Sequence, residues 1–394
     1  MDAARRRVVA TLGVTALAAL GRLRAVRAAP PAASASAPAS APALETVATF
    51  RDQFRLAGIG VTRTGRVFAA APSALKRSRF SVVEVDLRSG ALLPFPDAYW
   101  NAYKPHKPGD RQWICVQALW VDERDRLWVL DSSLPGADRR LQPPKLIQFD
   151  IDKAAPVRPY TFGNAITPAD APNDVRIDLQ HGYAYISIAG NRGGVLVVRL
   201  SDGLARLALA GDRSAMADPS QHLVLDGRVA RGPDGKTFTM QTNGIALSPQ
   251  RDWLYYRALT DHHYWRVPTD ALIDATLPAT VLSQQVQSLG DYALAAGLLM
   301  GADGTLYGGD LEHRSVIALT PADRNGQPGF TQRTLVDGAG HITWADSFAL
   351  QNNDLYFADS NWHELNALNG YPRKDRVSIF HIKLPPQPVG LFAG

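Results

Sequence analysis

Side chains with oxygen ligands recur at two positions of a hairpin that this sequence repeats. One set stands two residues before the first strand of its hairpin: Asn173, Asn243 and Asp346. The other stands three residues after an aromatic residue of the second strand: Asp131, Asp310 and Asp359. Because hairpin strands run antiparallel, these positions lie at the same edge, and oxygens gathered there are the ligands that Ca²⁺ requires. The alternative is that Asn and Asp form local turn hydrogen bonds at these positions.

Histidines beside carboxylates indicate proton transfer as a second possible chemistry. Glu312 and His313 follow the second strand of one hairpin directly, and a histidine backed by a carboxylate exchanges protons near neutral pH. His262 and His263 are adjacent on a strand, so at most one of them faces any given site. Hydrogen-bonded loop residues are again the alternative. Ser288 lacks the Gly-x-Ser-x-Gly elbow, so the sequence shows no serine hydrolase motif there.

The hairpin occurs six times, and each copy has an aromatic residue at the same point of its second strand. These residues are Phe68, Trp128, Tyr185, Tyr255, Tyr307 and Tyr356. The intervals between them are 60, 57, 70, 52 and 49 residues. A hairpin repeated at roughly 50-residue intervals, with further strands after each copy, is typical of propeller blades. We therefore predict an all-β fold, a six-bladed β-propeller over residues 44–394, rather than a β-sandwich, which has no reason to repeat one hairpin six times.

A closed repeat places each offset of the hairpin at one height on the propeller axis. The oxygen-bearing side chains should therefore converge at one mouth of the central channel. The predicted ligand-binding residues are Asn173, Asn243, Asp346, Asp310, Glu312, His313 and Asp359. The first three are also the candidate metal ligands. Asp346 is the acid among these three, so a cation or an amine is the expected guest.

The N-terminal residues have the pattern of an export signal. Arg5-Arg-Arg7 precedes an apolar run, Val8–Leu20, and Ala25-Val-Arg-Ala28 offers a small-residue cleavage site. Paired arginines before the apolar run favour the twin-arginine route, although the usual Phe-Leu after them is missing. Residues 1–28 are thus predicted to be a signal peptide. Residues 29–43, built from Ala, Pro and Ser, are predicted to be a disordered linker.

The net charge of +5 comes entirely from the predicted signal peptide. The chain has 42 Lys and Arg against 37 Asp and Glu, and residues 1–28 hold six Arg and one Asp. The remaining chain has 36 residues of each sign and no basic stripe, so we expect no nucleic-acid partner. We also expect no stable membrane span after cleavage. Cys115, the one cysteine, is predicted to be a buried small hydrophobe.

Several motifs resemble the major royal jelly protein/Yellow family. They are Leu119-Trp-Val-Asp-Glu-Arg-Asp-Arg-Leu-Trp-Val-Leu-Asp131, Pro172-Asn-Asp-Val-Arg-Ile-Asp178, Asn243-Gly-Ile-Ala-Leu-Ser-Pro249 and, similar to the bacterial branch, Leu355-Tyr-Phe-Ala-Asp-Ser-Asn361. The resemblance covers about residues 50–385 in order. It implies a secreted six-bladed propeller, while the known roles of the family range over dopachrome conversion, binding of small amines, and storage or signalling.

Three functions follow from these observations. The first is an exported propeller in the periplasm or outside the cell that binds a small cationic or aromatic molecule at one channel mouth. Such a protein either binds its ligand without catalysis or acts as a dopachrome-tautomerase-like enzyme, an activity that the family resemblance implies. The second is a metal-dependent lactonase of the gluconolactonase type, although the first-blade glutamate of that pattern is replaced within Ala57-Gly-Ile-Gly-Val61. The third is a non-catalytic interaction or storage propeller. No cofactor other than Ca²⁺ is expected.

The export route gives the first testable prediction. Replacing Arg5 and Arg6 by lysine should trap a folded precursor inside the cell, because the twin-arginine route needs the paired arginines. Cell fractionation measures this, and a mature chain beginning near Ala29 is expected for the unchanged protein. Normal export of the double variant would contradict the twin-arginine route but not the signal peptide itself.

Overall fold

Short runs of β-branched and aromatic residues form the strands of this protein. The computed structural model describes residues 42–51, 54–72, 78–104, 111–133, 142–338, 340–372 and 376–386. The chain divides into a unit Met1–Ser40 and a unit Ala41–Gly394, and all described residues belong to the second. The predicted signal peptide and all but the last two residues of the predicted linker therefore lie outside the described residues.

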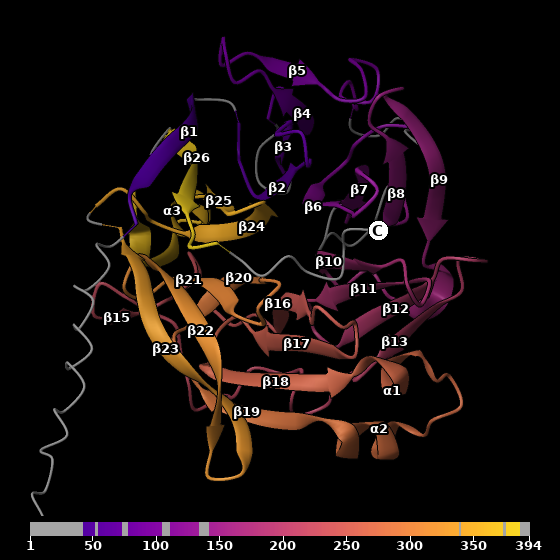
Figure 1. Ribbon diagram of the computed structural model, residues 1–394, viewed down its shortest axis with the longest axis vertical. Coiled ribbons are helices and arrows are strands. Elements are labelled where there is room, and N and C mark those ends of the chain that lie inside the picture. The colour runs from indigo at the N-terminus through magenta and orange to yellow at the C-terminus, as the bar shows by residue number, and fades with distance from the viewer. Residues whose placement is uncertain are drawn as a thin grey trace, which may run out of the picture. The chain divides into compact units, whose positions relative to one another are not determined.

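Six antiparallel four-stranded sheets form a ring, as Figure 1 shows. The first three blades are β2 (Gly58–Val61), β3 (Val67–Ala70), β4 (Val82–Val85) and β5 (Leu92–Pro94); β6 (Val116–Val121), β7 (Arg126–Asp131), β8 (Lys145–Asp150) and β9 (Ala155–Thr161); and β10 (Pro172–Asp178), β11 (Tyr183–Ile188), β12 (Val195–Arg199) and β13 (Ala205–Ala208).

The remaining blades have the same strand order. They are β16 (Thr242–Leu247), β17 (Trp253–Ala258), β18 (His263–Pro268) and β19 (Gln287–Asp291); β20 (Ala295–Met300), β21 (Leu306–Asp310), β22 (Ser315–Arg324) and β23 (Gln327–Asp337); and β24 (Ala345–Gln351), β25 (Asp354–Asp359), β26 (Arg376–Lys383) and β1 (Leu44–Arg51). The predicted six-bladed β-propeller is confirmed.

The last blade takes its outermost strand from the beginning of the unit. β1 pairs antiparallel with β26, from Leu44 opposite Ile382 to Arg51 opposite Arg376. The hairpin repeat does not include β1, so the sequence pattern did not predict this strand. Its pairing joins the two ends of the propeller and closes the ring.

The repeated aromatic residues lie in the apolar layers between blades. Phe68, Trp128, Tyr185, Tyr255 and Tyr307 are buried, whereas Tyr356 is half-buried. Trp128, for example, belongs to one apolar cluster with Ile186 and Leu196 of the next blade. Cys115 is buried as predicted. Packing between neighbouring blades therefore supplies the core.

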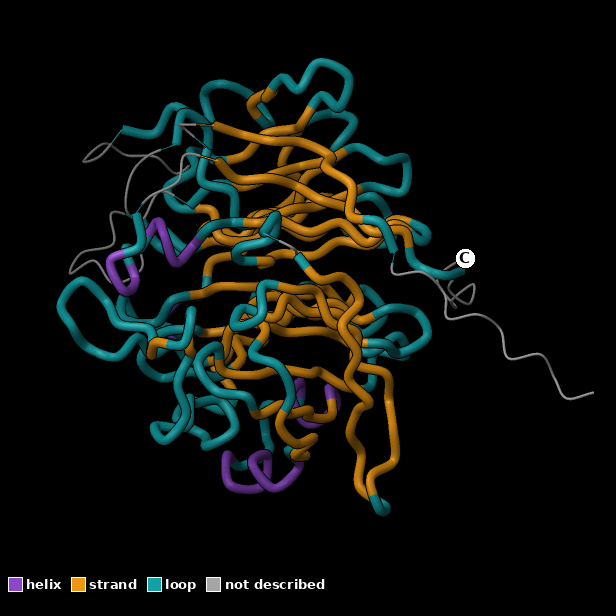
Figure 2. Tube along the Cα trace, turned by 90° about the vertical axis from the view of Figure 1, so that its left-hand side faces the viewer, coloured by secondary structure: helices purple, strands orange, loops and turns teal. Residues whose placement is uncertain are grey.

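Loops and a few short elements make up both faces of the ring, while strands occupy the middle (Figure 2). The described helical elements are η1 (Gly163–Ala165), α1 (Thr269–Ile273), α2 (Ala279–Gln285), α3 (Trp362–Leu365) and η2 (Leu368–Gly370). A small hairpin, β14 (Val224–Leu225) and β15 (Arg228–Val229), follows the third blade in the sequence and packs against Leu311 and Trp344 of the last two blades. Among the described residues, no helix is long and apolar enough to cross a membrane.

Ring closure gives the second prediction. Phe50 of β1 is buried against Val377 and Ile379 of β26, and its ring centroid lies 5.2 Å from that of Phe54. Phe50→Ala should lower the free energy of unfolding by about 3–5 kcal/mol, the usual cost of truncating a buried Phe. Urea denaturation measures this change.

Leu93 provides the matched control. It lies on β5, the outermost strand of the first blade, and is 50% exposed. Leu93→Ala should change the free energy of unfolding by less than about 0.5 kcal/mol. Equal effects of the two substitutions would contradict a closing role for β1.

Candidate functional site

The innermost strand of five blades is bulged within its first residues. The ladder shifts register after Val116 in β6, Pro172 in β10, Thr242 in β16, Ala295 in β20 and Ala345 in β24. A bulge leaves extra residues outside the ladder and re-aims their side chains. In this protein, the re-aimed residues come from neighbouring blades around one axis.

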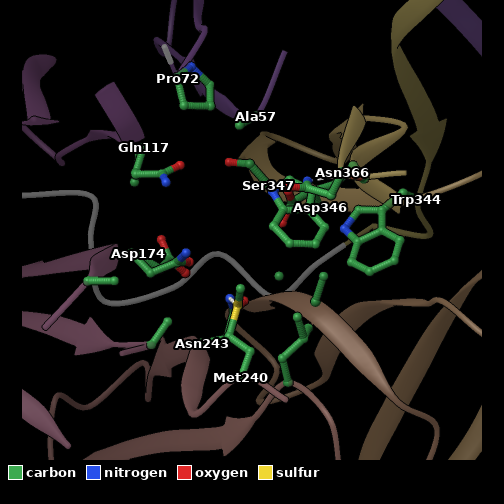
Figure 3. A pocket seen from close by; sticks show the side chains of 18 of the residues that line it. Ala57, Pro72, Gln117, Asp174, Met240, Asn243, Trp344, Asp346, Ser347 and Asn366 are labelled. Carbon is green, nitrogen blue, oxygen red and sulfur yellow. Dashed lines mark hydrogen bonds between the residues drawn. The ribbon is translucent and has the colours of Figure 1, made fainter. Parts of the chain in front are cut away.

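These bulges surround a cavity of about 230 Å³ at the centre of the ring. The bulge residues that line it are Gln117, Asn173, Asp174, Asn243, Ala296, Gly297, Asp346 and Ser347. Figure 3 shows Gln117, Asp174, Asn243 and Asp346 directed from different sides toward a common space. Ala57 and Arg55 contribute to the lining from the first-blade side. The site is therefore built where the inner strands begin.

The inner strands approach one another so closely that some bulge positions accommodate only glycine. A Cβ atom on Gly297 would lie 1.6 Å from the carbonyl oxygen of Asp346, and one on Gly244 would lie 2.3 Å from that of Ala296. No side chain fits at these distances. Backbone contact between blades thus fixes the position of Asp346.

Asp174 is held by a buried arginine. Its Oδ1 accepts hydrogen bonds from Arg176 Nη1 at 2.7 Å and from the Val175 amide at 2.8 Å. The Arg176 guanidinium also lies 4.6 Å from the ring centroid of Trp120 and donates to the Leu298 carbonyl. Burial raises the pKa of Asp174, while the charge and hydrogen bond of Arg176 act against this rise. Arg176 therefore orients Asp174 and favours its ionised form.

The groups that shift the pKa of Asp346 include no positively charged side chain, in contrast to Asp174. Burial raises the pKa of Asp346 to about 7, with a further contribution from the negative charge of Asp174, while a hydrogen bond with Ser360 lowers it. Two carboxylates that share a cavity resist simultaneous ionisation. Asp346 can therefore exchange a proton near neutral pH.

The rest of the cavity lining is mainly apolar and aromatic. Its larger apolar and aromatic side chains are Met240, Leu259, Trp344 and Trp362. The ring of Trp362 stacks on Trp344 with centroids 5.6 Å apart and also contacts Phe238 at 5.3 Å. The cavity lining thus combines two carboxylates with aromatic and apolar side chains.

The structure brings together three of the seven predicted site residues. Asn173, Asn243 and Asp346 line the cavity, whereas the described lining does not include Asp310, Glu312, His313 or Asp359. Asp310 and Asp359 lie opposite Ala295 and Ala345, at the start of two inner strands, so a place for them near the same rim stays a prediction. Whether the inner three bind a ligand stays a prediction.

The other four predicted residues are engaged in local contacts. Asp359 accepts the Thr343 and Trp344 amides, and Asp310 accepts the Glu312 and His313 amides together with a contact to His313 Nδ1 at 2.8 Å. Glu312 accepts the Val224 amide and lies 2.9 Å from His262 Nε2. Asp131, at the same offset as Asp310, is buried and paired with Lys145 at 2.9 Å. Asp310 and Asp359 thus hydrogen-bond to loops of their own blades, whereas Glu312 contacts residues that are far from it in the sequence.

Asp174 is the cavity acid that the sequence analysis missed. An ideal strand alternates its faces, so Asp174 should point away from the face of Asn173. The bulge breaks this alternation, and both residues line the cavity. The available signal was the adjacent pair Asn173-Asp174 at the start of an inner strand.

The residues present give an incomplete set for a calcium ion. Among the described residues, no group of three or more His, Cys, Asp and Glu side chains is placed to hold a metal. Asp174 and Asp346 would need the amide oxygens of Asn173 and Asn243 to approach the six to eight oxygens that Ca²⁺ takes. One oxygen of Asp174 already accepts from Arg176. Calcium at this cavity therefore stays a prediction.

Comparison with known proteins now places the chain in a family. The fold and the cavity define a six-bladed propeller with a polar pocket on its axis. The family model described as major royal jelly protein matches residues 114–330, more than half of the chain. The chain belongs to the major royal jelly protein family.

The individual relatives are distant. Major royal jelly protein 8 of Apis mellifera is 24% identical over 300 residues, which cover 73% of this chain and 63% of the relative. Major royal jelly protein 5 of the same organism is 25% identical over 259 residues, which cover 61% of this chain and 40% of the relative. The matches thus span less than two thirds of the length of these relatives. A luciferin-regenerating enzyme has a similar fold, with a TM-score of 0.54 at 11% identity over 89% of this chain and 98% of that one.

The raised pKa of Asp346 gives the third prediction. The folded protein, with its Asp346 pKa of about 7 against an ordinary 3.8, binds this proton more tightly than the unfolded chain. The contribution of Asp346 to stability is therefore complete below pH 3.8 and is lost as the pH rises toward about 7. Asp346→Asn should remove this loss, because asparagine does not ionise. Between pH 4 and pH 8, the unfolding free energy of the variant should fall by at least about 1 kcal/mol less than that of the unchanged protein, since one pKa unit corresponds to about 1.4 kcal/mol.

Urea denaturation across this pH range measures the difference between the two proteins. Asp152→Asn is the control, because the Asp152 side chain is 94% exposed and should give a pH profile close to that of the unchanged protein. Parallel profiles for Asp346→Asn and the unchanged protein would contradict the assigned environment of Asp346.

Proposed function

We propose that this protein is exported and binds a small cationic molecule with an apolar or aromatic group in the central cavity. The observation that carries the proposal is the placement of Asp174 and Asp346 in one cavity of about 230 Å³. A bound cation would relieve the repulsion that raises the pKa of Asp346. The paired arginines and apolar run of residues 5–20 support export.

The cavity has a suitable place for the apolar part of such a ligand. Trp362 and Met240 line it together with the acids, and Trp362 is supported by its stack with Trp344. An aromatic face also attracts cations. Arg55 is a lining cation, but the nearby charges that raise the pKa of Asp346 are those of Asp174 and Asp359. An aromatic amine has a cationic group for the carboxylates of Asp174 and Asp346 and a ring for the aromatic lining.

Proton transfer is a second candidate function, favoured by the same acid. General acid–base catalysis works best when the pKa of the group is close to the working pH. Asp346, with a pKa of about 7, meets this condition. In a dopachrome-tautomerase-like reaction, Asp346 would take a proton from one position of the substrate and return it at another. Asp174, oriented by Arg176, would hold the substrate.

Two further alternatives stay open to experiment. A lactonase of the gluconolactonase type would need a metal held by Asp346, Asn173 and Asn243, and the first blade supplies Ala57 rather than a glutamate to the cavity. An interaction or storage propeller would need no ligand in the cavity. The lactonase should lose its activity on chelation of the metal, and the interaction propeller should bind no amine in the cavity.

Binding of tyramine gives the fourth prediction. Isothermal titration of the mature protein should detect saturable binding, and Asp174→Asn or Asp346→Asn should weaken it about tenfold or more, because one charge-assisted hydrogen bond contributes about 1.5–3 kcal/mol. Binding to the unchanged protein should also strengthen from pH 6 to pH 8 as Asp346 ionises. Asp152→Asn should bind normally.

A matched ligand and a chelator separate the alternatives. 2-(4-Hydroxyphenyl)ethanol has the ring of tyramine without the amine and should bind at least about tenfold more weakly. Equal binding of the two ligands would contradict recognition of a cation. Hydrolysis of a sugar lactone that is lost with EDTA would support the lactonase instead. Turnover of dopachrome that survives EDTA and is lost in Asp346→Asn would support the proton-transfer function.

A further inference from the structure

A serine, a histidine and an aspartate form a linear hydrogen-bonded chain on the outer edge of the fourth blade. His263 of β18 lies with Nδ1 2.6 Å from Asp291 Oδ1 and with Nε2 2.7 Å from Ser288 Oγ, both residues belonging to β19. The sequence analysis treated His263 and Ser288 separately and found no motif for either. This kind of site is recognised by its geometry rather than by sequence position.

The partners of His263 determine which ring nitrogen carries the proton. An ionised Asp291 only accepts hydrogen bonds, so Nδ1 of neutral His263 must be protonated and must donate to it. Nε2 is then the acceptor, and the Ser288 hydroxyl donates to it. This arrangement makes His263 a base for the proton of Ser288, with Asp291 fixing the tautomer.

A bulge in β19 brings the two partners to the same face. His263 is opposite Asp291, Tyr264 is opposite Gly290, and Trp265 is opposite Ser288, so Leu289 is an extra residue in the ladder. Residues three apart on an ideal strand point to opposite faces. The bulge removes this difference, and Gly290 provides the positive φ of 92° that the turn of the backbone requires. Ser288 and Asp291 therefore both contact His263.

The three residues are open to solvent, and His263 lines a second hollow. Ser288 is exposed, and the His263 and Asp291 side chains are 25% and 58% exposed. His263 and Trp265, whose ring centroids lie 4.3 Å apart, line a hollow of about 380 Å³ together with Arg213 and Met216. The Arg213 guanidinium lies 5.4 Å from the Trp265 ring centroid. The hollow thus has apolar side chains and one arginine, and two acids, Asp218 and Asp261, also line it.

We propose that Ser288, His263 and Asp291 form a nucleophilic site that hydrolyses small carboxylic esters, independent of the central cavity. Ser288 Oγ bonds to the ester carbonyl carbon while its proton passes to His263 Nε2. The bond from that carbon to the alcohol oxygen then breaks, and the alcohol leaves with the proton from His263. Water, deprotonated by His263, hydrolyses the acyl-serine to the free acid. Arg213 stabilises the oxyanion, and Trp265 with Met216 contacts the acyl group.

A fluorophosphonate probe tests the proposed site in the full mature protein. Mass spectrometry should find the probe on Ser288, and His263→Ala should reduce this labelling at least about tenfold, because removal of the base removes the activated nucleophile. Hydrolysis of p-nitrophenyl acetate should fall in parallel in Ser288→Ala and Asp291→Asn. Ser201, exposed in the third blade, is the matched control and should not be labelled.

Two outcomes would overturn the proposal. Equal labelling of Ser288 and Ser201 would show that Ser288 is not activated. Ester hydrolysis that persists in Ser288→Ala, while the melting temperature is unchanged, would assign the reaction to another group. Neither readout involves Asp174 or Asp346, so failure here is distinct from failure of the proposed cavity function.

Discussion

Backbone contact between neighbouring blades around the axis is the constraint on which the rest of the structure depends. Six inner strands begin close together, and Gly244 and Gly297 meet carbonyl oxygens of the next blade at distances that exclude a side chain. With the backbones fixed in this way, the bulges of the inner strands direct their side chains into the small space that remains. The strand β1 maintains this arrangement from outside by joining the last blade to the beginning of the unit.

Asp131 and Asp346 illustrate the difference between an acid that stabilises the structure and a candidate functional acid. Asp131 is buried but receives amide hydrogen bonds from Ile114 and Cys115 as well as the charge of Lys145. Asp346 is near another carboxylate, Asp174, and has a pKa of about 7. An acid with complete hydrogen bonding stabilises a loop, whereas one with a perturbed pKa in a cavity is available for a ligand or a proton.

Periodicity predicted the fold and three residues of the cavity lining, because both depend on what is repeated. The six aromatic residues located the blades, and the shared offset located Asn173, Asn243 and Asp346. Features that interrupt the repeat could not be predicted from periodicity. β1 lies outside the repeated hairpin, and the bulges that expose Asp174 and align Ser288 with Asp291 are local insertions in a ladder that the pattern treats as regular. The role of the aspartates after the second strands could not be predicted from their shared offset, because their hydrogen bonds to nearby loops depend on loop residues that are not repeated.

The coupling of Asp174 and Asp346 in one cavity is the central claim, and direct titration of the Asp346 carboxyl group tests it. Carbon-13 NMR of aspartate-labelled protein, assigned with Asp346→Asn, follows this group from pH 3 to pH 9. We expect a midpoint for Asp346 near 7 in the unchanged protein. We expect a lower midpoint in Asp174→Asn, because the neighbouring negative charge is then absent. A midpoint near 4 in both proteins would show that the two carboxyl groups are not coupled.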